Sequence, residues 1–369
     1  MKKATFECKV ITPMFMFGGD GGSVELRPSE FKGMMRFWWR AVKAEDDIEK
    51  LRKGEARLFG GTGEGEGRSK IKIRVIPNRI SSEFIGKNFR DEIKSDTGNE
   101  HIGLAYLMYS TFTLRARGEP IIKKYIKPDF EFKIKLSSFN KKSLKEALAS
   151  LWLSIFLGGF GTRARRGGGN LEVTNIDGDT YNLDFIPTAN DKDELKNWFE
   201  KNIKEIKNII LTSSSTSKYS NLKNGKILIF NPFSPEEERE GWKEALNFIG
   251  SEFKNFRKVN KNRLWDMSAF GMPVMHSRFK VRMVPYKADN KRLSDRLSSP
   301  LVIKVVKSGD LYFPLMVILT TKVEKVGKEI KQGNKWKEAQ NRDIEHFNLR
   351  GVKEFINNMK EKGAVEVVL

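Results

Sequence analysis

The chain has 369 residues, which at about 150 residues per domain predicts two or three domains. Its 68 lysines and arginines outnumber its 47 acidic residues and give a net charge of +21, while hydrophobic residues still make up 39% of the sequence. This balance fits a globular protein with a polyanionic partner and excludes a disordered tail. One cysteine and three histidines are too few for a zinc ribbon or a disulfide framework, so we expect no metal and no cofactor.

The sequence also argues against a membrane protein. The longest strongly apolar run, from Leu151 to Phe160, covers about half of the roughly 20 residues that a membrane-spanning helix needs. The amino terminus lacks the apolar stretch of a signal peptide. We therefore expect a soluble, cytoplasmic protein with no membrane partner.

The first half of the chain alternates predicted strands and helices. Apolar and polar residues alternate from Ala4 to Val10, which predicts a strand. Ser29 is a suitable N-cap for a helix that runs to about Lys43. The remaining predicted elements of this half are helices at 46–59 and 143–157 and strands at 71–75, 104–115, 130–136 and 171–176.

The second half repeats this pattern of elements without repeating the sequence. Its predicted strands lie at 227–230, 279–284, 301–306, 311–319 and 365–369, and its predicted helices at 235–248 and 344–359. Read coarsely, each half gives strand, helix, strand, strand, helix, strand, the order of a ferredoxin-like domain. We therefore expect an α+β fold of tandem ferredoxin-like, RRM-like domains with antiparallel sheets and helical insertions. The domains are expected at 1–185 and 226–369, joined by a helical and polar connector at 186–225.

The first predicted helix has an apolar stripe that should face a sheet and a second, basic side. The basic side consists of Lys32, Arg36, Trp39, Arg40 and Lys43. Arginines that bind phosphate beside an aromatic ring that stacks a base are common in single-strand binding proteins. The alternative is an ordinary solvated helix face with a tryptophan that belongs to the core.

The segment 158–170, between a predicted helix and a predicted strand, is the most informative stretch. It contains six glycines and three arginines and no acid. Glycine lets a backbone approach a ligand closely, and guanidinium groups match the geometry of phosphate. The predicted phosphate-binding residues are Arg163, Arg165, Arg166, Gly167 and Gly168, with a flexible structural loop as the alternative. A dinucleotide-binding fingerprint is excluded because it needs a strand before it and a helix after it, and the glycines at 61–69 lack the spacing of a P-loop.

Several segments together carry a family resemblance. Leu26-Arg27-Pro28, the run KGMMRFWWR at 32–40, the run EARLFG at 55–60 and the loop 158–170 resemble the RAMP superfamily. More narrowly, they resemble the first-numbered RAMP subunit of the Cmr complex, the subtype III-B CRISPR effector, and the run RLSSPL at 296–301 is similar to a segment of that family. One departure is the loop's end, from Arg166 to Asn170, where an aromatic residue commonly stands between glycines; this puts a base-stacking contact there in doubt.

The resemblance implies tandem ferredoxin-like domains and a place in a crRNA-guided complex that acts in antiviral defence and targets RNA. The implied partners are crRNA, single-stranded target RNA and other Cmr subunits. The implied role is the binding of single-stranded RNA near the 3′ end of the guide.

A second basic region lies between Ser251 and Asp310, where 14 lysines and arginines stand against 5 acids. Arg278, Lys280 and Arg282 occupy alternate positions of a predicted strand, so they would line one side of a sheet and could follow a phosphate backbone. The alternative is the solvent face of an antiparallel sheet.

Candidate catalytic residues are few. His276, beside the basic strand, and Asp20, in a glycine-rich loop, are the residues that could act as a general base. A histidine next to arginines is more often structural, and an aspartate in such a loop is usually a turn former. Cys8 falls on the apolar side of its strand and should be buried. We therefore expect a non-catalytic RNA-binding protein; the alternatives are an endoribonuclease acting on guide precursors and a general binder of single-stranded DNA and RNA.

Overall fold

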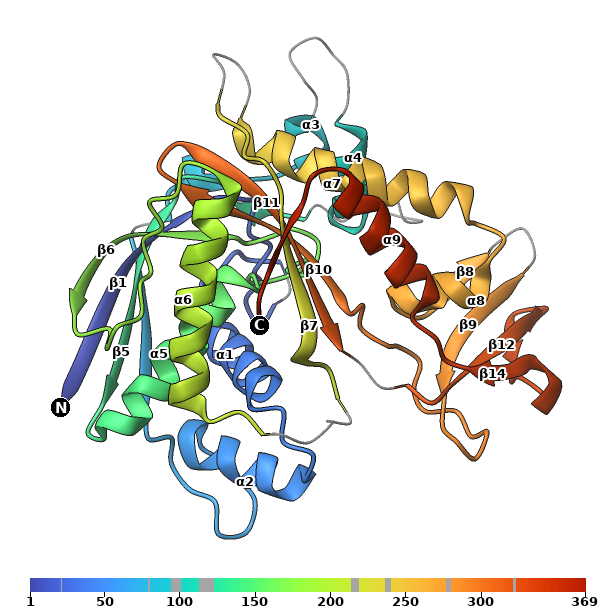
Figure 1. Ribbon diagram of the computed structural model, residues 1–369, viewed down its shortest axis with the longest axis horizontal. Helices are drawn as coiled ribbons and strands as arrows, with labels where there is room; N and C mark the ends of the chain where they lie inside the picture. The colour runs from blue at the N-terminus through green and yellow to red at the C-terminus, as the bar shows by residue number, and fades with distance from the viewer. Residues whose placement is uncertain are drawn as a thin grey trace.

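The computed structural model describes residues 1–20, 22–78, 80–93, 101–112, 123–213, 219–235, 240–276, 280–320 and 323–369. It is an α+β structure of antiparallel sheets with helices packed on them (Figure 1).

The first half of the chain forms a four-stranded antiparallel sheet. Its elements are β1 (Lys2–Val10), α1 (Pro28–Lys43), α2 (Ile48–Phe59), β2 (Lys72–Pro77), β5 (Glu131–Ser138), α5 (Lys141–Phe156) and β6 (Leu171–Gly178). The spatial order β2-β5-β1-β6 places the first and third strands of the unit in the centre, as in a ferredoxin-like domain. The predicted N-cap Ser29 is wrong, because α1 begins one residue earlier at Pro28, whose fixed φ suits the first position of a helix, and Ser29 lies within its first turn. The α5 helix is capped by Asn140, whose side chain accepts a hydrogen bond from the Ser143 backbone N–H at 2.9 Å.

The second half forms a sheet with the same topology. Its elements are β7 (Asn221–Ile229), α7 (Gly241–Val259), β10 (Leu301–Ser308), β11 (Leu311–Thr320), α9 (Arg350–Glu361) and β15 (Val365–Val367). The order β10-β11-β7-β15 is again ferredoxin-like. The tandem arrangement is therefore confirmed, whereas the domain boundaries at residues 185 and 225 stay predictions.

A third sheet, inserted into the second unit, corrects the predicted role of the strand at 279–284. Its strands are β8 (Val274–His276), β9 (Val281–Tyr286), β12 (Lys325–Gln332), β13 (Lys335–Lys337) and β14 (Ile344–His346). The predicted strand is β9 of this insertion, and the second and third strands of the second unit are the hairpin of β10 and β11 instead. Short strands such as β13 and β14 have too few residues for a periodicity to show in the sequence.

The remaining elements connect these sheets. They are β3 (Ile85–Gly86), α3 (Phe89–Glu92), α4 (Ile102–Met108), β4 (Tyr125–Ile126), α6 (Lys192–Ile210) and α8 (Leu264–Met267), with short 3₁₀ turns that include Tyr109–Thr111. The predicted strand at 104–115 is wrong over its described part, because Leu104, Leu107 and Met108 are buried at the three- and four-residue spacing of a helix.

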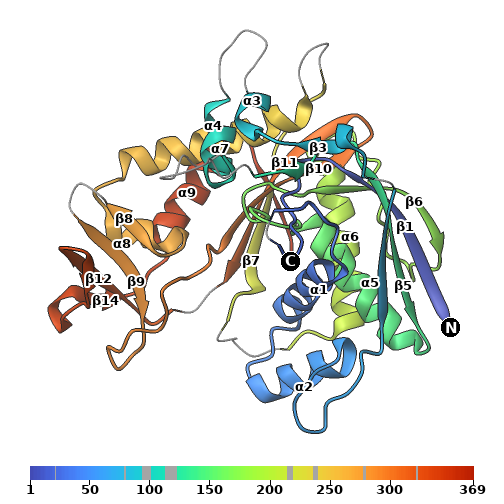
Figure 2. The same ribbon diagram turned by 180° about the vertical axis from the view of Figure 1, so that it is seen from behind.

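The layers alternate between sheets and helices. Helices α1, α5 and α6 lie between the first sheet and the β7-β10-β11 sheet, and α7 and α9 lie beyond the second sheet (Figures 1 and 2). The central sheet is buried on both faces: Val302, Phe313 and Leu315 face the helices of the first half, while Leu301 and Ile303 face α7. Both halves thus share one core, which holds the Gly-Arg loop (residues 158–170) against the start of β10.

Candidate nucleic-acid interface

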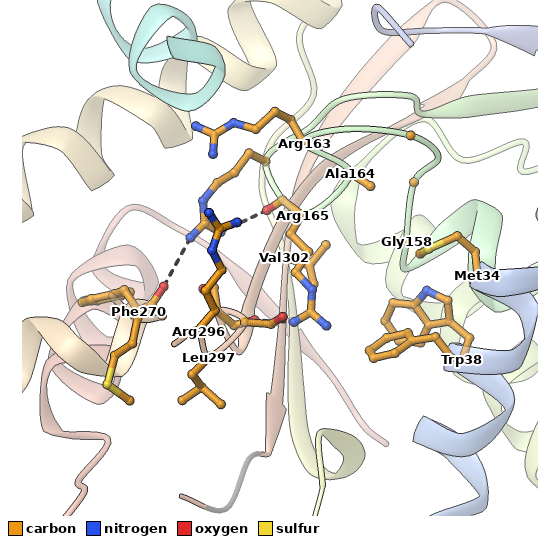
Figure 3. Close-up of a pocket in the computed structure, with 18 of the residues that line it drawn as sticks. Met34, Trp38, Gly158, Arg163, Ala164, Arg165, Phe270, Arg296, Leu297 and Val302 are labelled. Carbon is orange, nitrogen blue, oxygen red and sulfur yellow. Dashed lines mark hydrogen bonds between the residues drawn. The ribbon is translucent and has the colours of Figure 1, made fainter. Parts of the chain in front are cut away.

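A cavity of about 640 Å³ lies where the two halves meet. Figure 3 shows Met34 and Trp38 of α1 on one side, Phe270, Arg296 and Leu297 of the second half on the other, and Arg163 and Arg165 of the Gly-Arg loop between them. None of the described residues that line the cavity is acidic. The residues that line the cavity include Met34, Phe37, Trp38, Gly158, Arg163, Arg165, Arg166, Phe270, Arg296, Ser298 and Ser299.

The Gly-Arg loop is fixed to the second half by hydrogen bonds to the backbone at the start of β10. The Ile303 N–H donates to the Arg165 carbonyl at 3.2 Å, and the guanidinium of Arg166 donates to the Leu301 carbonyl at 2.7 Å. Arg165 donates to the carbonyl of Ser299. On the other side, Gly161 has φ +79° and an added Cβ would lie 2.5 Å from the Phe15 carbonyl, so only glycine fits there. The loop is therefore held in one conformation at the junction of the halves.

Lys304 of β10, which is 0% exposed, also links the second half to the start of the loop. Its Nζ donates to the Gly158 carbonyl at 3.0 Å and to the Ile155 carbonyl, both at the carboxyl-terminal end of α5. Burial lowers the pKa of Lys304 well below its ordinary value.

The arginines of the loop form a cationic cluster that no carboxylate of the described residues neutralises. Burial lowers the pKa of Arg163 and Arg165. For Arg166, burial and the neighbouring Arg163, Arg257 and Arg165 lower the pKa to about 9. The guanidinium of Arg163 lies 4.7 Å from the centre of the Tyr109 ring, and the Arg165 and Arg166 heads lie over phenylalanine rings. Aromatic faces and carbonyls thus replace carboxylates around these cations, and an anion in the cavity would relieve their mutual repulsion.

Two buried donors at the wall of the cavity have no hydrogen-bond partner among the described residues. They are the indole N–H of Trp38 and the Nε–H of Arg163. Leaving a buried donor unpaired costs about 1–3 kcal/mol, which a bound acceptor group would offset.

The basic side of α1 does not join this cluster, so the phosphate-binding role of Arg36 and Arg40 stays a prediction. Both guanidinium groups bind the nearly buried carboxylate of Glu55 from α2, Arg40 at 2.5 Å. Lys32, one turn before Arg36, is partly buried, and burial followed by the charge of Arg36 lowers its pKa; its role in RNA binding stays a prediction. The side of α1 that reaches the cavity carries Met34, Phe37 and Trp38 instead.

Trp39 is a core residue, so the predicted base-stacking role is wrong. It is 2% exposed, and its indole N–H donates to Glu146 of α5 at 3.1 Å. A buried indole with a satisfied N–H offers no face to a base.

Gly167 and Gly168 are also packing residues rather than ligand-binding ones. Both are buried, an added Cβ at Gly167 would collide with Leu246 of α7, and one at Gly168 would lie 2.9 Å from the Thr162 carbonyl. The close backbone approach that these glycines allow is to the protein itself.

The structure does not place the described members of the predicted basic row, Lys280 and Arg282, on one strand. Arg278 lies outside the described residues, and Lys280 is an exposed turn residue with φ +50° that precedes β9. Arg282 is on β9, but its guanidinium binds the buried Glu329 of β12 at 2.7 Å and lies over Trp336. Arg292 and Tyr286 contact the same carboxylate. Arg282 and Arg292 therefore satisfy a buried carboxylate of the third sheet.

The site residues that the predictions missed come from the second half. Arg296 is exposed at the cavity, and Ser298 and Ser299 line it beside the Phe270 backbone. The family resemblance of residues 296–301 was the one signal for them, since nothing in their local spacing indicates a ligand.

The candidate catalytic residues lie elsewhere. The Asp20 carboxylate accepts hydrogen bonds from the backbone N–H groups of Gly22 and Ser23, both at 3.0 Å, which lowers its pKa to about 2 and makes it a turn former and a weak base. His276 is on β8 and does not line the cavity. Cys8 is buried, as predicted. The described ranges contain no cluster of three or more histidine, cysteine or acidic residues able to hold a metal ion, and no helix long and apolar enough to cross a bilayer.

Comparisons with known proteins agree with this architecture. The model of the RAMP superfamily matches residues 7–172. The CRISPR system Cmr subunit Cmr1-1 of Pyrococcus furiosus is 30% identical over 297 residues, 77% of each chain, and subunit Cmr1-2 of the same organism is 34% identical over 185 residues, covering 47% of this chain and 96% of its own length.

Solved structures share the fold. A crystal structure of Cmr1 from Pyrococcus furiosus in its apo form has 23% identity and a TM-score of 0.64, covering 100% of this chain and 99% of its own. A chain of a cryo-EM structure of the type III-B Cmr-beta complex bound to cognate target RNA has 12% identity and a TM-score of 0.57, covering 98% of this chain and 99% of its own. From the sequence matches together with the fold, the chain belongs to the Cmr1 family of the RAMP superfamily.

Proposed function

We propose that the chain is a non-catalytic, RNA-binding subunit of a type III-B CRISPR effector complex, and that it holds single-stranded RNA near the 3′ end of the guide in the cavity between its halves. The single observation that carries the binding site is the cluster of Arg163, Arg165 and Arg166, which have no carboxylate partner among the described residues and line a cavity whose described lining contains no acid. Such a cluster is costly in the free protein and becomes favourable when phosphate enters.

The roles of the three arginines differ. Arg165 donates a hydrogen bond to the carbonyl of Ser299, and Arg166 donates one to the carbonyl of Leu301, so these two arginines position the loop and contribute positive charge. Arg163, with its free Nε–H, and the exposed Arg296 are the groups that can bind phosphate directly. The apolar wall formed by Met34, Phe37 and Trp38 suits the face of a base.

The test of this site is the double variant R163Q–R296Q in the full chain. Each phosphate contact on a single strand contributes about 0.7 to the slope of log affinity against log salt, so the double variant should lose about 1.4 of that slope and bind oligouridylate roughly 25-fold more weakly at 0.1 M salt. The control is K335Q, which removes an exposed cation on the third sheet. Equal binding by both variants would remove the cavity assignment.

Two further measurements address the alternatives. Copurification of Cmr subunits and crRNA with the tagged chain from native cells is expected for a complex subunit and not for a general single-strand binder. Incubation of the isolated chain with guide-precursor RNA should yield no cleavage; cleavage that D20N or H276A abolishes would establish the endoribonuclease instead.

A further inference from the structure

The outer face of the first sheet carries a second group of cations that the cavity does not use. In the strand register, Arg74 of β2 lies directly opposite Lys135 of β5. In the next row, Ser137 of β5 lies between Lys72 and Lys3. We name these four side chains, Lys3, Lys72, Arg74 and Lys135, the outer basic patch.

The patch faces away from the core of the molecule. Side chains alternate along a strand, and the intervening residues Phe6 and Ile134 are buried against the helices. Helices α1, α5 and α6 all lie on that inner side of the sheet (Figure 1). Lys3, Lys72 and Arg74 are exposed and Lys135 is partly exposed. The patch is therefore open, and the sheet and its helices separate it from the cavity.

The charges of the patch are unpaired, unlike those beside it. None of its four side chains forms an ion pair or hydrogen bond with a described residue. On the same face Lys133 binds Glu7 at 2.7 Å. Across the sheet, the row that contains Arg74 and Lys135 continues through β1 to Asp177 of β6. Asp177 lies two strand spacings, or about 10 Å, from Lys135, which is too far for an ion pair between their backbone positions. Like charges directly opposite each other on a sheet destabilise it, so this arrangement is a cost in the free protein.

We propose that the outer basic patch binds the sugar-phosphate backbone of a nucleic-acid strand, as a second contact surface independent of the cavity. Lysines stand at the centre of the patch, whereas the centres of protein–protein interfaces are depleted in lysine and enriched in aromatic residues, so the composition favours a phosphate backbone over an acidic protein. Thr5, which carries a hydroxyl, lies directly opposite Lys135 in the strand register. Phe139, which is 87% exposed just after β5, offers a ring for a base at the rim.

The chain offers a matched pair of variants to test this. Lys135 and Lys133 lie two residues apart on the same face of β5, and replacing either by glutamine removes one positive charge. K135Q should weaken binding of 30-nucleotide oligouridylate about fivefold at 0.1 M salt, as one lost phosphate contact predicts, and should raise the urea midpoint of unfolding because a repulsion is removed. K133Q should change affinity less than twofold and should not raise the midpoint, because it breaks the pair with Glu7.

The two proposed surfaces are separated by repeating K135Q in the R163Q–R296Q background. If the patch binds a nucleic-acid strand, K135Q lowers the affinity for oligouridylate and the salt slope both in the unaltered chain and in the R163Q–R296Q chain. This holds whatever effect R163Q–R296Q has by itself. If K135Q and K133Q have the same effect on affinity, the patch is only a solvated face and the proposal is overturned. Release of another Cmr subunit by K135Q with oligonucleotide binding intact would likewise overturn it, in favour of a protein partner.

The nature of the strand follows from a parallel measurement with 30-nucleotide oligodeoxythymidylate. An equal loss for DNA and RNA shows recognition of the shared backbone, and a loss for one alone identifies that nucleic acid as the ligand. Either result supports the patch.

Discussion

At the scale of single residues, the arginines of this protein differ by what their guanidinium groups touch. Arg36 and Arg40 share Glu55, and Arg282 binds Glu329, so these cations are neutralised within the fold. Arg163 and Arg166 contact aromatic rings and carbonyls, and no carboxylate of the described residues binds them. We therefore expect the first group to contribute to stability, and we propose that the second contributes to binding.

Trp39 provides a test of this division. The variant W39F should lower the free energy of unfolding by about 1–3 kcal/mol, because the buried Glu146 loses a donor, while the affinity of the folded protein for oligouridylate stays the same. Chemical denaturation and fluorescence anisotropy measure the two quantities. A loss of affinity with unchanged stability would restore the stacking role for Trp39.

Arg282 should behave in the same way. In R282M the carboxylate of Glu329, 1% exposed, keeps Arg292 and Tyr286 but loses one charged donor, so we expect about 1.5–3 kcal/mol less stability. The salt slope of RNA binding should match that of the unaltered protein. A smaller slope would instead return Arg282 to the phosphate-binding group.

At the scale of elements, the decisive feature is the attachment of the Gly-Arg loop to β10. A backbone hydrogen bond, two arginine side chains and Lys304 connect the two, so the loop is placed by the second sheet although its own helix and strand belong to the first. Neither half alone provides the cavity, since its lining comes from both.

Lys304 gives this attachment a pH dependence. Burial lowers the pKa of Lys304 in the folded protein, whereas the unfolded chain has the ordinary lysine pKa of about 10.4. Between these two pKa values the unfolded chain binds more protons than the folded protein. The free energy of unfolding therefore rises with pH in this window, by up to about 1.4 kcal/mol per pH unit. The variant K304M lacks this pH-dependent contribution to stability. Urea unfolding of both proteins at pH 8, 9 and 10 measures this. As pH rises, the free energy of unfolding of the unaltered protein should increase relative to that of K304M. A constant difference would mean that the amine stays charged in the fold.

At the scale of the whole molecule, the two ferredoxin-like units share a core. The central sheet is covered on one side by α1, α5 and α6 of the first half and on the other by α7 and α9. The long apolar runs of β10 and β11 follow from this, since a strand buried on both faces has no polar side. Separated halves would expose a large apolar surface.

We therefore expect one cooperative unfolding transition rather than two. Phe313, 0% exposed on the face shared with the first half, is the probe: F313A should destabilise the entire chain by about 3–5 kcal/mol. Calorimetry reports one transition shifted as a whole if the core is shared. Two transitions, of which F313A moves only one, would show that the units fold independently.

The sequence by itself determined the elements with long, regular patterns. The α1 and α5 helices and the strand β1 follow from the spacing of their apolar residues, and the strands β10 and β11 from their continuous apolar runs, because the direction of a side chain depends on its position within a few residues of the chain. The family and the importance of the loop 158–170 were likewise readable from local motifs. The third sheet was not, because its short strands are stabilised by pairing across long separations.

Only the tertiary structure decided which cations are available to a ligand. Arg36 and Glu55 are 19 residues apart and Arg282 and Glu329 are 47 apart, so no local pattern reveals that these charges are paired. Arg296 and Arg163 come from different halves and meet only because both units pack on one core. Secondary structure depends on neighbours in the chain, whereas the free charge of an arginine depends on neighbours in space.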